Sequence, residues 1–160
     1  MATVYLETSF VSACVTNRTD PASLYRKEVS LEWWATQSHR HQLYISAEVL
    51  AELSQPGFPC AEEALSQVEQ VPLLAMNEEV QGLAILLVRA KVMPSPVAGD
   101  ALHVAVASVH GMSYMLSWNV RHLANPSKLT HLRVVCLRAG LIPPQILTPD
   151  LLWEEQDENF

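Results

Sequence analysis

Short apolar segments rich in β-branched and aromatic residues alternate along this chain with longer segments of helical spacing. The expected strands are residues 3–6, 42–45, 114–117 and 145–147, with 71–74 as a short strand or an extended link. The expected helices are residues 22–38, 47–53, 59–70, 78–90, 101–109 and 127–139. Parallel strands need crossover connections, so this alternation predicts an α/β domain with helices on both faces of a parallel sheet. We expect one domain over residues 1–153 and an acidic, mobile tail over residues 154–160.

One uncharged stretch is long enough to cross a membrane. Residues 101–120 contain no Asp, Glu, Lys or Arg. The stretch nevertheless carries His103, His110 and Asn119, and its pattern changes midway from helical spacing to a short strand. We interpret it as a buried helix followed by an interior strand. The first residues lack the pattern of a signal peptide, and the three cysteines are far apart, so we expect a cytoplasmic protein with no membrane segment.

The charge is distributed unevenly. The chain has 160 residues, of which 49% are hydrophobic and 17% charged, which is enough apolar material for a core. The formal net charge of −7 argues at first against a nucleic-acid partner. However, there is no acid between Asp100 and Asp150, where Arg121, Lys128 and two further arginines lie. This segment is either a basic flank for phosphates or a solvated helix face balanced by the acidic tail.

Polar residues follow three of the expected strands and open the helix at residue 100. Glu7 follows the first strand, Glu48 and Glu52 follow the second, Asp100 begins the apolar helix, and Asn119 follows the strand at 114–117. In parallel α/β sheets, functional groups gather at the carboxyl ends of the strands. Carboxylates converging from several elements are the oxygen ligands that Mg²⁺ or Mn²⁺ requires. The positions therefore indicate a divalent-metal site.

Each of these residues also has a purely structural interpretation. Asp100 could cap its helix, Glu48 is an acid of a first helical turn, and Glu7 could be a turn residue. Glu52 lies one turn further along, where the helix dipole no longer favours an acid, so a functional role is favoured. His103 lies three residues after Asp100 on the same helix face and could be a core histidine.

Two adjacent tryptophans lie in the helix expected at 22–38. Leu24, Leu31, Trp34 and Ala35 have the spacing of an apolar face. Because neighbouring residues cannot share a helix face, we expect one of Trp33 and Trp34 in the core and the other at an edge or interface. Other catalytic motifs do not occur: there is no GxGxxG, no Walker-type loop and no GxSxG.

Taken in order, four motifs resemble the PIN-domain family. They are Val-Tyr-Leu-Glu-Thr-Ser at 4–9, Tyr-Ile-Ser-Ala-Glu-Val-Leu-Ala-Glu at 44–52, Asp-Ala-Leu-His-Val-Ala at 100–105 and Leu-Ser-Trp-Asn at 116–119. The match extends to residues 146–149 and is most similar to the branch of VapC-like toxins from bacterial toxin–antitoxin pairs. The resemblance implies a three-layer α/β/α sandwich with a central parallel sheet.

The resemblance also implies roles for single residues. Glu7, Glu52 and Asp100 would bind Mg²⁺ or Mn²⁺ as catalytic acids, and Asn119 would take the fourth catalytic position. The family usually has Asp at the positions of Glu7 and Asn119, so the chain departs from the pattern twice. The resemblance and the spacing assign substrate binding to four further residues, which are Thr8, Ser9, His103 and Arg121.

The function implied by the resemblance is a divalent-metal-dependent endoribonuclease. Its substrate would be RNA, a partner antitoxin would block the site, and the chain would form a homodimer. The alternative is a PIN-like module that binds RNA or protein with little or no catalysis, which the residues at positions 7 and 119 favour. A third interpretation is a structural partner in which the acids are only helix caps.

Overall fold

Five parallel strands form one sheet in the described part of the chain. A computed structural model of the chain describes residues 1–155, so most of the predicted acidic tail, residues 156–160, lies outside the described residues. The sheet has the order β3-β2-β1-β4-β5, and every pairing in it is parallel. The strands are β1 (Ala2–Leu6), β2 (His41–Ser46), β3 (Leu73–Leu74), β4 (Tyr114–Leu116) and β5 (Gln145–Leu147). The predicted central parallel sheet is confirmed, with every strand at its expected place.

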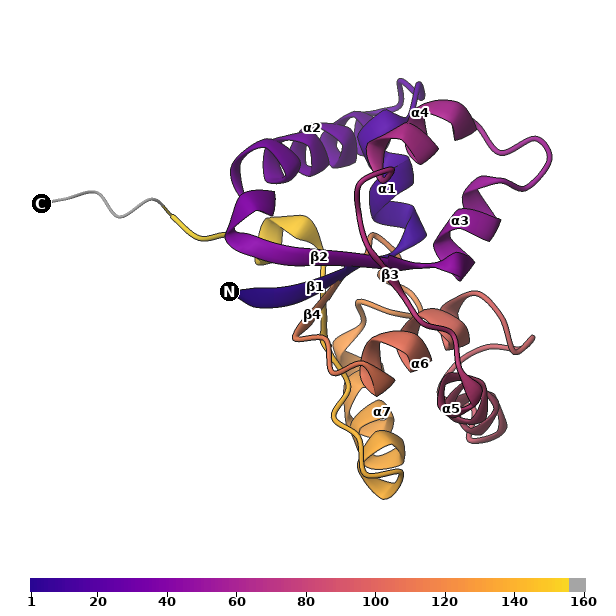
Figure 1. Ribbon diagram of the computed structural model, residues 1–160. Coiled ribbons are helices and arrows are strands. Elements are labelled where there is room, and N and C mark those ends of the chain that lie inside the picture. Colours follow the sequence, from indigo (N-terminus) through magenta and orange to yellow (C-terminus); the bar gives the residue numbers. More distant parts are fainter. Residues whose placement is uncertain (156–160) are drawn as a thin grey trace, which may run out of the picture.

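Helices cover both faces of this sheet. In Figure 1, α1 to α4 lie above the sheet and α5 to α7 lie below it, which gives the predicted three layers. The helices are α1 (Thr8–Val15), α2 (Pro21–Thr36), α3 (Ala47–Leu53), α4 (Ala61–Gln67), α5 (Glu78–Arg89), α6 (Asp100–Val109) and α7 (Pro126–Arg138), with 3₁₀ turns η1 (Ser38–Arg40) and η2 (Pro149–Leu151). The contacts within the layers agree, since α1 packs on α2 and α4 while α5 packs on α6 and α7.

Helix α1 is absent from the sequence prediction. The triplet at residues 7–9 was expected to end a strand, but here Glu7 is the N-cap of a helix, and its carboxylate accepts a hydrogen bond from the backbone N–H of Ser9. An acceptor at this position satisfies one of the free N–H groups of a first turn. The helix is short and buries Phe10, Val11 and Cys14 against the core. It therefore directs the chain away from the sheet immediately after Glu7.

The predicted apolar face of α2 is wrong, although the prediction for the tryptophan pair is confirmed. The side chains of Leu24 and Leu31 are 50% and 42% exposed, whereas Trp33 is fully buried. The indole N–H of Trp33 donates to the carbonyl of Leu152 at 2.7 Å, so the C-terminal segment covers this side of the helix. Helical spacing cannot indicate which face a distant segment will cover. Trp34 lies at an edge, where it lines a hollow.

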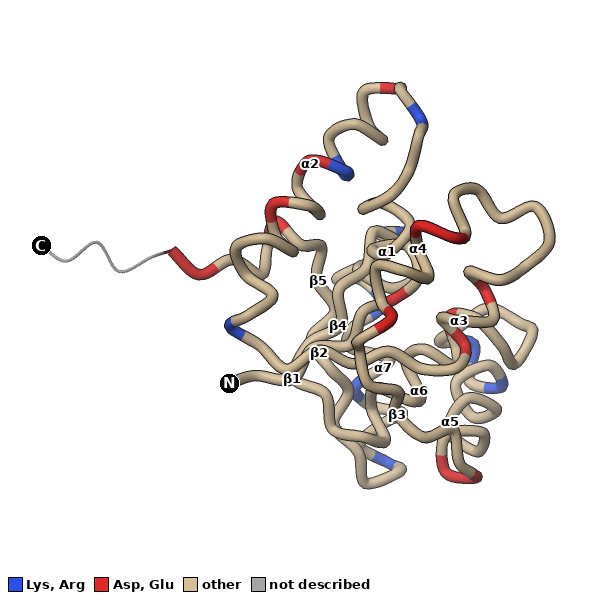
Figure 2. Tube along the Cα trace, turned by 45° about the horizontal axis from the view of Figure 1, so that its top comes forward, with Lys and Arg blue, Asp and Glu red and all other residues tan. Residues whose placement is uncertain are grey.

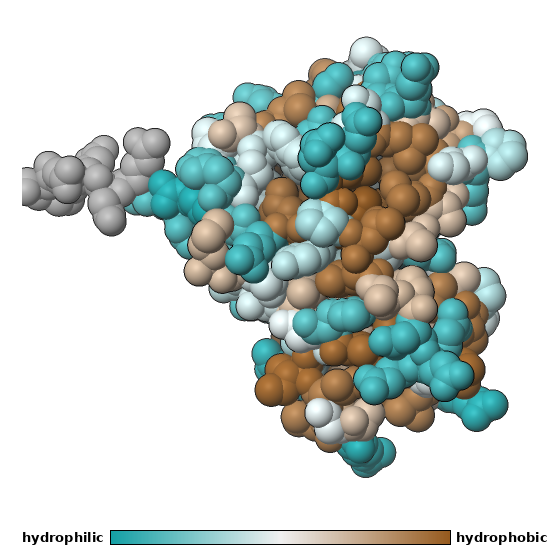
Figure 3. All heavy atoms as spheres, in the orientation of Figure 1, coloured by the Kyte–Doolittle hydropathy of each residue, from teal (hydrophilic) through white to brown (hydrophobic). Residues whose placement is uncertain are grey.

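The uncharged stretch forms a buried helix and an interior strand, as predicted. Residues 101–108 of α6 are all buried, and β4 lies between β1 and β5. Within residues 1–155, each helix is too short or too polar to span a lipid bilayer. Figure 3 shows that the apolar surface seen in this view is broken up by polar residues rather than forming a continuous belt.

Acidic segments lie in both helical layers. Figure 2 shows acidic segments on α3, on α4 and at the start of α5.

Glu154 was expected to begin the mobile tail. Its backbone N–H and C=O are instead hydrogen-bonded to the side-chain amide of Gln37 at 2.9 and 3.2 Å, and its carboxylate pairs with Arg40 at 3.2 Å.

Candidate functional site

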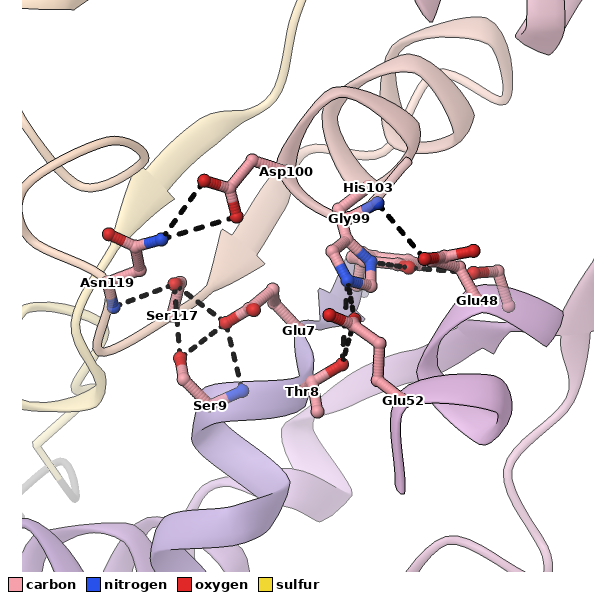
Figure 4. Close-up of polar contacts among 12 residues, drawn as sticks. Glu7, Thr8, Ser9, Glu48, Glu52, Gly99, Asp100, His103, Ser117 and Asn119 are labelled. Atoms are coloured by element: carbon pink, nitrogen blue, oxygen red, sulfur yellow. Dashed lines mark hydrogen bonds and ion pairs between the residues drawn. The ribbon is translucent and has the colours of Figure 1, made fainter. Parts of the chain in front are cut away.

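The predicted polar residues meet at the carboxyl edge of the sheet. Glu7 directly follows β1, while Ser117 and Asn119 directly follow β4, and the strand order reverses between these two strands. Such a reversal leaves a crevice in which parallel α/β sheets usually bind ligands. Helix α3 brings Glu52 from the end of β2, and α6 begins at the same edge. Figure 4 shows these side chains pointing toward one another.

Glu7 is held in a buried cradle of hydroxyl and amide donors. Its Oε2 accepts hydrogen bonds from the backbone N–H of Ser9 at 3.0 Å, from the Ser9 hydroxyl and from the Ser117 hydroxyl at 2.8 Å. Burial raises the pKa of Glu7, and the charge of His103 together with the serine hydrogen bonds only partly opposes this shift. Within residues 1–155, the second oxygen, Oε1, has no hydrogen-bond partner, so it is free to bind a ligand.

Glu52 is paired with a fully buried histidine. Its Oε1 accepts a hydrogen bond from the Thr8 hydroxyl at 2.7 Å and contacts Nε2 of His103. Burial pushes the pKa of Glu52 upward, but the hydrogen bond and charge of His103 together with the Thr8 hydrogen bond outweigh burial, and the net pKa lies below its usual value. For His103, burial lowers the pKa, but the hydrogen bond to Glu52 and the charges of the nearby glutamates together outweigh burial and raise it. Both directions favour a charged pair.

His103 is fixed from its other side as well. Its Nδ1 lies 2.6 Å from the Tyr5 hydroxyl, which in turn lies 2.8 Å from the hydroxyl of Ser46. The imidazole has no exposed surface. His103 was expected to bind substrate, but the buried imidazole leaves no part of the ring for a substrate to touch. The ring instead orients Glu52 from inside the core.

Asp100 faces Asn119 rather than capping its helix. The N-cap of α6 is Gly99, and no side chain caps this helix, so the capping interpretation of Asp100 is wrong. The Asn119 amide lies 3.3 and 3.4 Å from the two carboxylate oxygens of Asp100. Asn119 is itself oriented, because its Oδ1 accepts a hydrogen bond from the backbone N–H of His122 at 3.0 Å. These contacts aim the half-buried Asp100 carboxylate toward the edge between β1 and β4.

Glu48 has a role that the sequence analysis did not assign. Its carboxylate accepts a hydrogen bond from the backbone N–H of Gly99 at 3.0 Å, which ties α3 to the start of α6. Gly99 has φ +52° and ψ −120°, a conformation that suits glycine. Glu48, Glu52 and Asp100 line one hollow of about 320 Å³. The four-residue spacing of Glu48 and Glu52 places both on one face of α3, and that signal could have pointed to Glu48.

Three side chains lie close enough together to hold a metal ion. Ligand atoms of Glu7, Glu52 and His103 all lie within 4.8 Å of one another. In the described part of the chain, this group does not include Asp100. Glu7 keeps one oxygen free, and Oε2 of Glu52 is likewise without a partner in residues 1–155. His103 is charged in its pair with Glu52 and has no lone pair to offer a metal, so the two hard oxygen donors of Glu7 and Glu52 are the atoms of this acidic cluster that could bind a divalent cation.

The remaining predicted residues divide into two groups. Thr8 and Ser9 lie inside the site, and their hydroxyls donate to Glu52 and Glu7 respectively. Arg121 is exposed on the loop after Asn119, and within residues 1–155 its guanidinium forms no ion pair. The structure therefore places Thr8 and Ser9 beside the acids, whereas Arg121 is exposed to solvent on the loop that follows Asn119.

Comparison with known proteins identifies the fold. Neither a protein-family model nor a curated protein sequence matches the chain. The chain is similar to the crystal structure of VapC20 from Mycobacterium tuberculosis, described as a sarcin–ricin loop cleaving toxin. The TM-score is 0.56, and the match covers 74% of this chain and 92% of that one at 18% sequence identity. The chain has a PIN-like fold. This PIN-like fold confirms the predicted α/β/α architecture, in which the acidic cluster lies at the carboxyl edge of the sheet.

Proposed function

We propose that the chain is a divalent-metal-dependent endoribonuclease that resembles the toxin of a toxin–antitoxin pair. The observation that carries the proposal is the convergence of Glu7 and Glu52, from two different strand ends, into a cluster with ligand atoms within 4.8 Å. Each carboxylate keeps one oxygen without a partner in residues 1–155. The likeness to a structure described as an RNA-loop-cleaving toxin supports RNA as the substrate.

Glu7 and Glu52 would hold Mg²⁺ or Mn²⁺, with Asp100 facing the site from the start of α6. When bound there, the ion would polarise a phosphodiester and activate water for its hydrolysis. The chain's own residues supply the geometry. Thr8 and His103 fix the Oε1 of Glu52, so that its second oxygen stays directed outward. Ser9 and Ser117 do the same for Glu7.

The neutral amide of Asn119 sets the orientation of Asp100. It occupies the place where the family usually has a fourth acid, and it donates to both oxygens of Asp100. Asn119 thus acts in this proposal by positioning Asp100. Arg121 follows on the same loop and would meet a phosphate of the bound strand.

The test is cleavage of a labelled RNA by the purified chain with Mn²⁺, with Mg²⁺ and with EDTA. Asp100→Asn and Glu52→Gln keep the side-chain volume and remove a charge, and each should lower the rate at least about a hundredfold, a typical cost for electrostatic groups of an active site. Asp150→Asn, on the exposed turn η2, is the matched control and should cleave like the wild type. Cleavage that survives both substitutions, or that persists in EDTA, would contradict the proposal.

The second candidate is a PIN-like module that binds RNA or protein without catalysis. Asn119 favours it, because an amide adds no negative charge to the cluster and lowers the expected affinity for a cation. Calorimetric titration with MnCl₂ separates the two candidates. The nuclease binds Mn²⁺, and Glu52→Gln weakens this binding, whereas the binding module takes up RNA equally well with and without the ion.

An antitoxin is the proposed regulatory partner. A basic side chain reaching the Glu7 and Glu52 carboxylates would neutralise them and occupy the place of the cation. The homodimer and the cytoplasmic location stay predictions from the sequence.

A further inference from the structure

A second hollow opens beside the acidic cluster of Glu7 and Glu52, and its lining carries positive instead of negative charge. It has a volume of about 230 Å³ and shares Ser9 and Asn119 with the candidate site. Beyond these two residues, its lining includes two hydroxyl residues of the α1 segment, Ser12 and the C-cap Thr16, together with Arg18 and Arg26. Among the described residues that line it, none is acidic. A cationic, hydroxyl-lined hollow directly next to a metal-binding cluster suits a ligand that carries a chain of negative charges.

Arg26 is held in place before any ligand binds. Its guanidinium carbon lies 5.5 Å from the centroid of the Trp118 ring, a distance typical of a cation–π contact. Trp118 is only 8% exposed and is anchored at two points, by its indole N–H to the Ser30 hydroxyl and by its backbone N–H to the Ser9 hydroxyl, both at 2.8 Å. An interaction with an aromatic ring leaves the N–H donors of a guanidinium available to pair with a phosphate. Within residues 1–155, Arg26 forms no ion pair with a carboxylate.

The remaining walls hold the hollow open and add an aromatic surface. Lys27 donates to the backbone carbonyl of Thr16 at 2.8 Å and so fixes the end of α1 against α2. Arg18 is highly exposed and paired with Asp20 at 3.2 Å, which leaves Arg26 as the main cation of the hollow. Tyr25 meets Trp118 edge-on at 6.2 Å and is 52% exposed, so its ring can accept a stacked base.

We infer that this hollow binds the phosphodiester backbone of the RNA strand next to the bond placed at the acidic cluster. The identity of the strand rests on the proposed function. Arg26 pairs with the neighbouring phosphate, the α1 hydroxyls donate to the same backbone, and Tyr25 stacks on the adjoining base. An acidic peptide is the other occupant that a cationic hollow could take. RNA is favoured because the hollow is continuous with the cluster through Ser9 and Asn119 and has an aromatic ring at its side.

The test is equilibrium binding of a labelled single-stranded RNA in EDTA, where metal-dependent cleavage cannot occur. Arg26→Gln should weaken binding about tenfold, the expected loss of one charge-assisted pair. It should also lower the slope of log K against log salt by about 0.7, the value for one phosphate contact on a single strand. Tyr25→Leu should weaken binding severalfold and leave the slope unchanged, because stacking releases no counterions. Arg133→Gln, exposed on α7, is the matched control and should bind like the wild type.

Equal behaviour of Arg26→Gln and Arg133→Gln overturns the inference. So does displacement of the RNA by a poly-glutamate peptide of equal charge at the same concentration as unlabelled RNA, because the hollow is then an acidic-peptide site. The outcomes also separate this inference from the proposed function. If the wild type cleaves RNA while Arg26→Gln binds and cleaves normally, the inferred RNA-binding role of the hollow is wrong, but the proposed nuclease function is retained. If the wild type never cleaves RNA but RNA binding depends on Arg26, the proposed nuclease function is wrong, but the inferred role of the hollow is retained.

Discussion

The side-chain amide of Asn119 lies between 3.3 and 3.4 Å from both carboxylate oxygens of Asp100. A neutral donor therefore occupies the position at which a fourth acid would repel Asp100 in the absence of a cation. The contact joins the loop after β4 to the first turn of α6, two elements that meet at the edge of the sheet. The contact stabilises the site when no metal is bound, but the site then has one negative charge fewer than it would have with an acid at position 119.

Asn119→Asp should therefore lower the stability of the metal-free chain and raise its affinity for a divalent cation. We expect the substitution to lower the free energy of unfolding in EDTA by about 2 kcal/mol, since a hydrogen bond is replaced by a repulsion between two carboxylates. MnCl₂ should then raise the melting temperature more than it does for the wild type, because the ion binds only the folded chain. Asn125→Asp is the control: Asn125 is the N-cap of α7, where Asp serves equally well. Equal responses of both variants to Mn²⁺ would refute the prediction.

Thr8→Val should destabilise the chain through Glu52. The hydroxyl of Thr8 is buried and donates to Glu52 at 2.7 Å, so its loss leaves a partly buried carboxylate with one partner fewer. We expect a loss of about 1–2 kcal/mol in urea unfolding. Thr36→Val is the matched control, because the Thr36 hydroxyl makes an exposed hydrogen bond to the backbone carbonyl of Glu32. A loss at position 36 as large as that at position 8 would speak against a special role for the buried bond.

Gly99→Ala should be destabilising, whereas Gly82→Ala should be stabilising. A Cβ on Gly99 would meet Oε2 of Glu52 only at an ordinary 3.9 Å, so the cost of about 1–3 kcal/mol comes from its backbone at φ +52° and ψ −120°. Gly82 lies within α5 with no atom in reach of a Cβ, and Ala there should add about 0.5–1 kcal/mol. Thermal unfolding of both variants gives the two signs directly. A neutral Gly99→Ala would mean that the start of α6 can relax.

The stability of the metal-free chain should fall as the pH rises above neutral. Burial lowers the pKa of His103, but the hydrogen bond to Glu52 and the charges of Glu7, Glu52 and Glu48 together outweigh burial, so the folded chain keeps this proton to a higher pH than the unfolded chain. The stabilisation is thus fully present below about pH 6.5, the unfolded value, and is lost as the pH rises through the folded value. Urea unfolding in EDTA at pH 6 and pH 9 measures this loss.

His103→Gln should remove the part of the pH dependence that the Glu52 pair contributes. The variant is less stable at pH 6 and shows a smaller fall toward pH 9 than the wild type does. His131→Gln, exposed on α7, should retain the full wild-type fall. If His103→Gln keeps that fall too, another group controls the alkaline loss.

The sequence predicted the fold well because strand order depends on features that a sequence displays. The apolar segments ending at Leu6 and Leu116 indicated strands, and the helices between them required parallel pairing. Helix α1 escaped prediction because its cap, Glu7, directly follows the first strand, where a polar residue is also typical of a turn. The buried face of α2 escaped because Leu152, far along the chain, covers Trp33.

The candidate site was predicted by position more accurately than by role. Glu7 and Glu52 do converge, as the rule for parallel sheets indicates. His103 and Asp100 share a helix face, yet the spacing could not show that His103 turns inward to Glu52 while Asp100 turns to Asn119. The two side-chain directions depend on which residues of α3 and of the loop after β4 pack against α6. That packing is a tertiary contact, which helical spacing does not indicate. Glu48 is the acid of a first helical turn that the sequence indicated, but its partner, a backbone N–H 51 residues away, could not be predicted for the same reason.

The hydrogen bonds that hold Glu7 join segments of the chain that are synthesised at different times. The Ser117 hydroxyl that binds the Glu7 carboxylate is synthesised 110 residues after Glu7. Glu52 is likewise without its partner His103 for 51 residues of synthesis. A nascent or truncated chain that ends before β4 therefore carries the acids without the arrangement that makes them a site. Whatever chemistry the acids perform is withheld until β4 and the residues that follow it have been made.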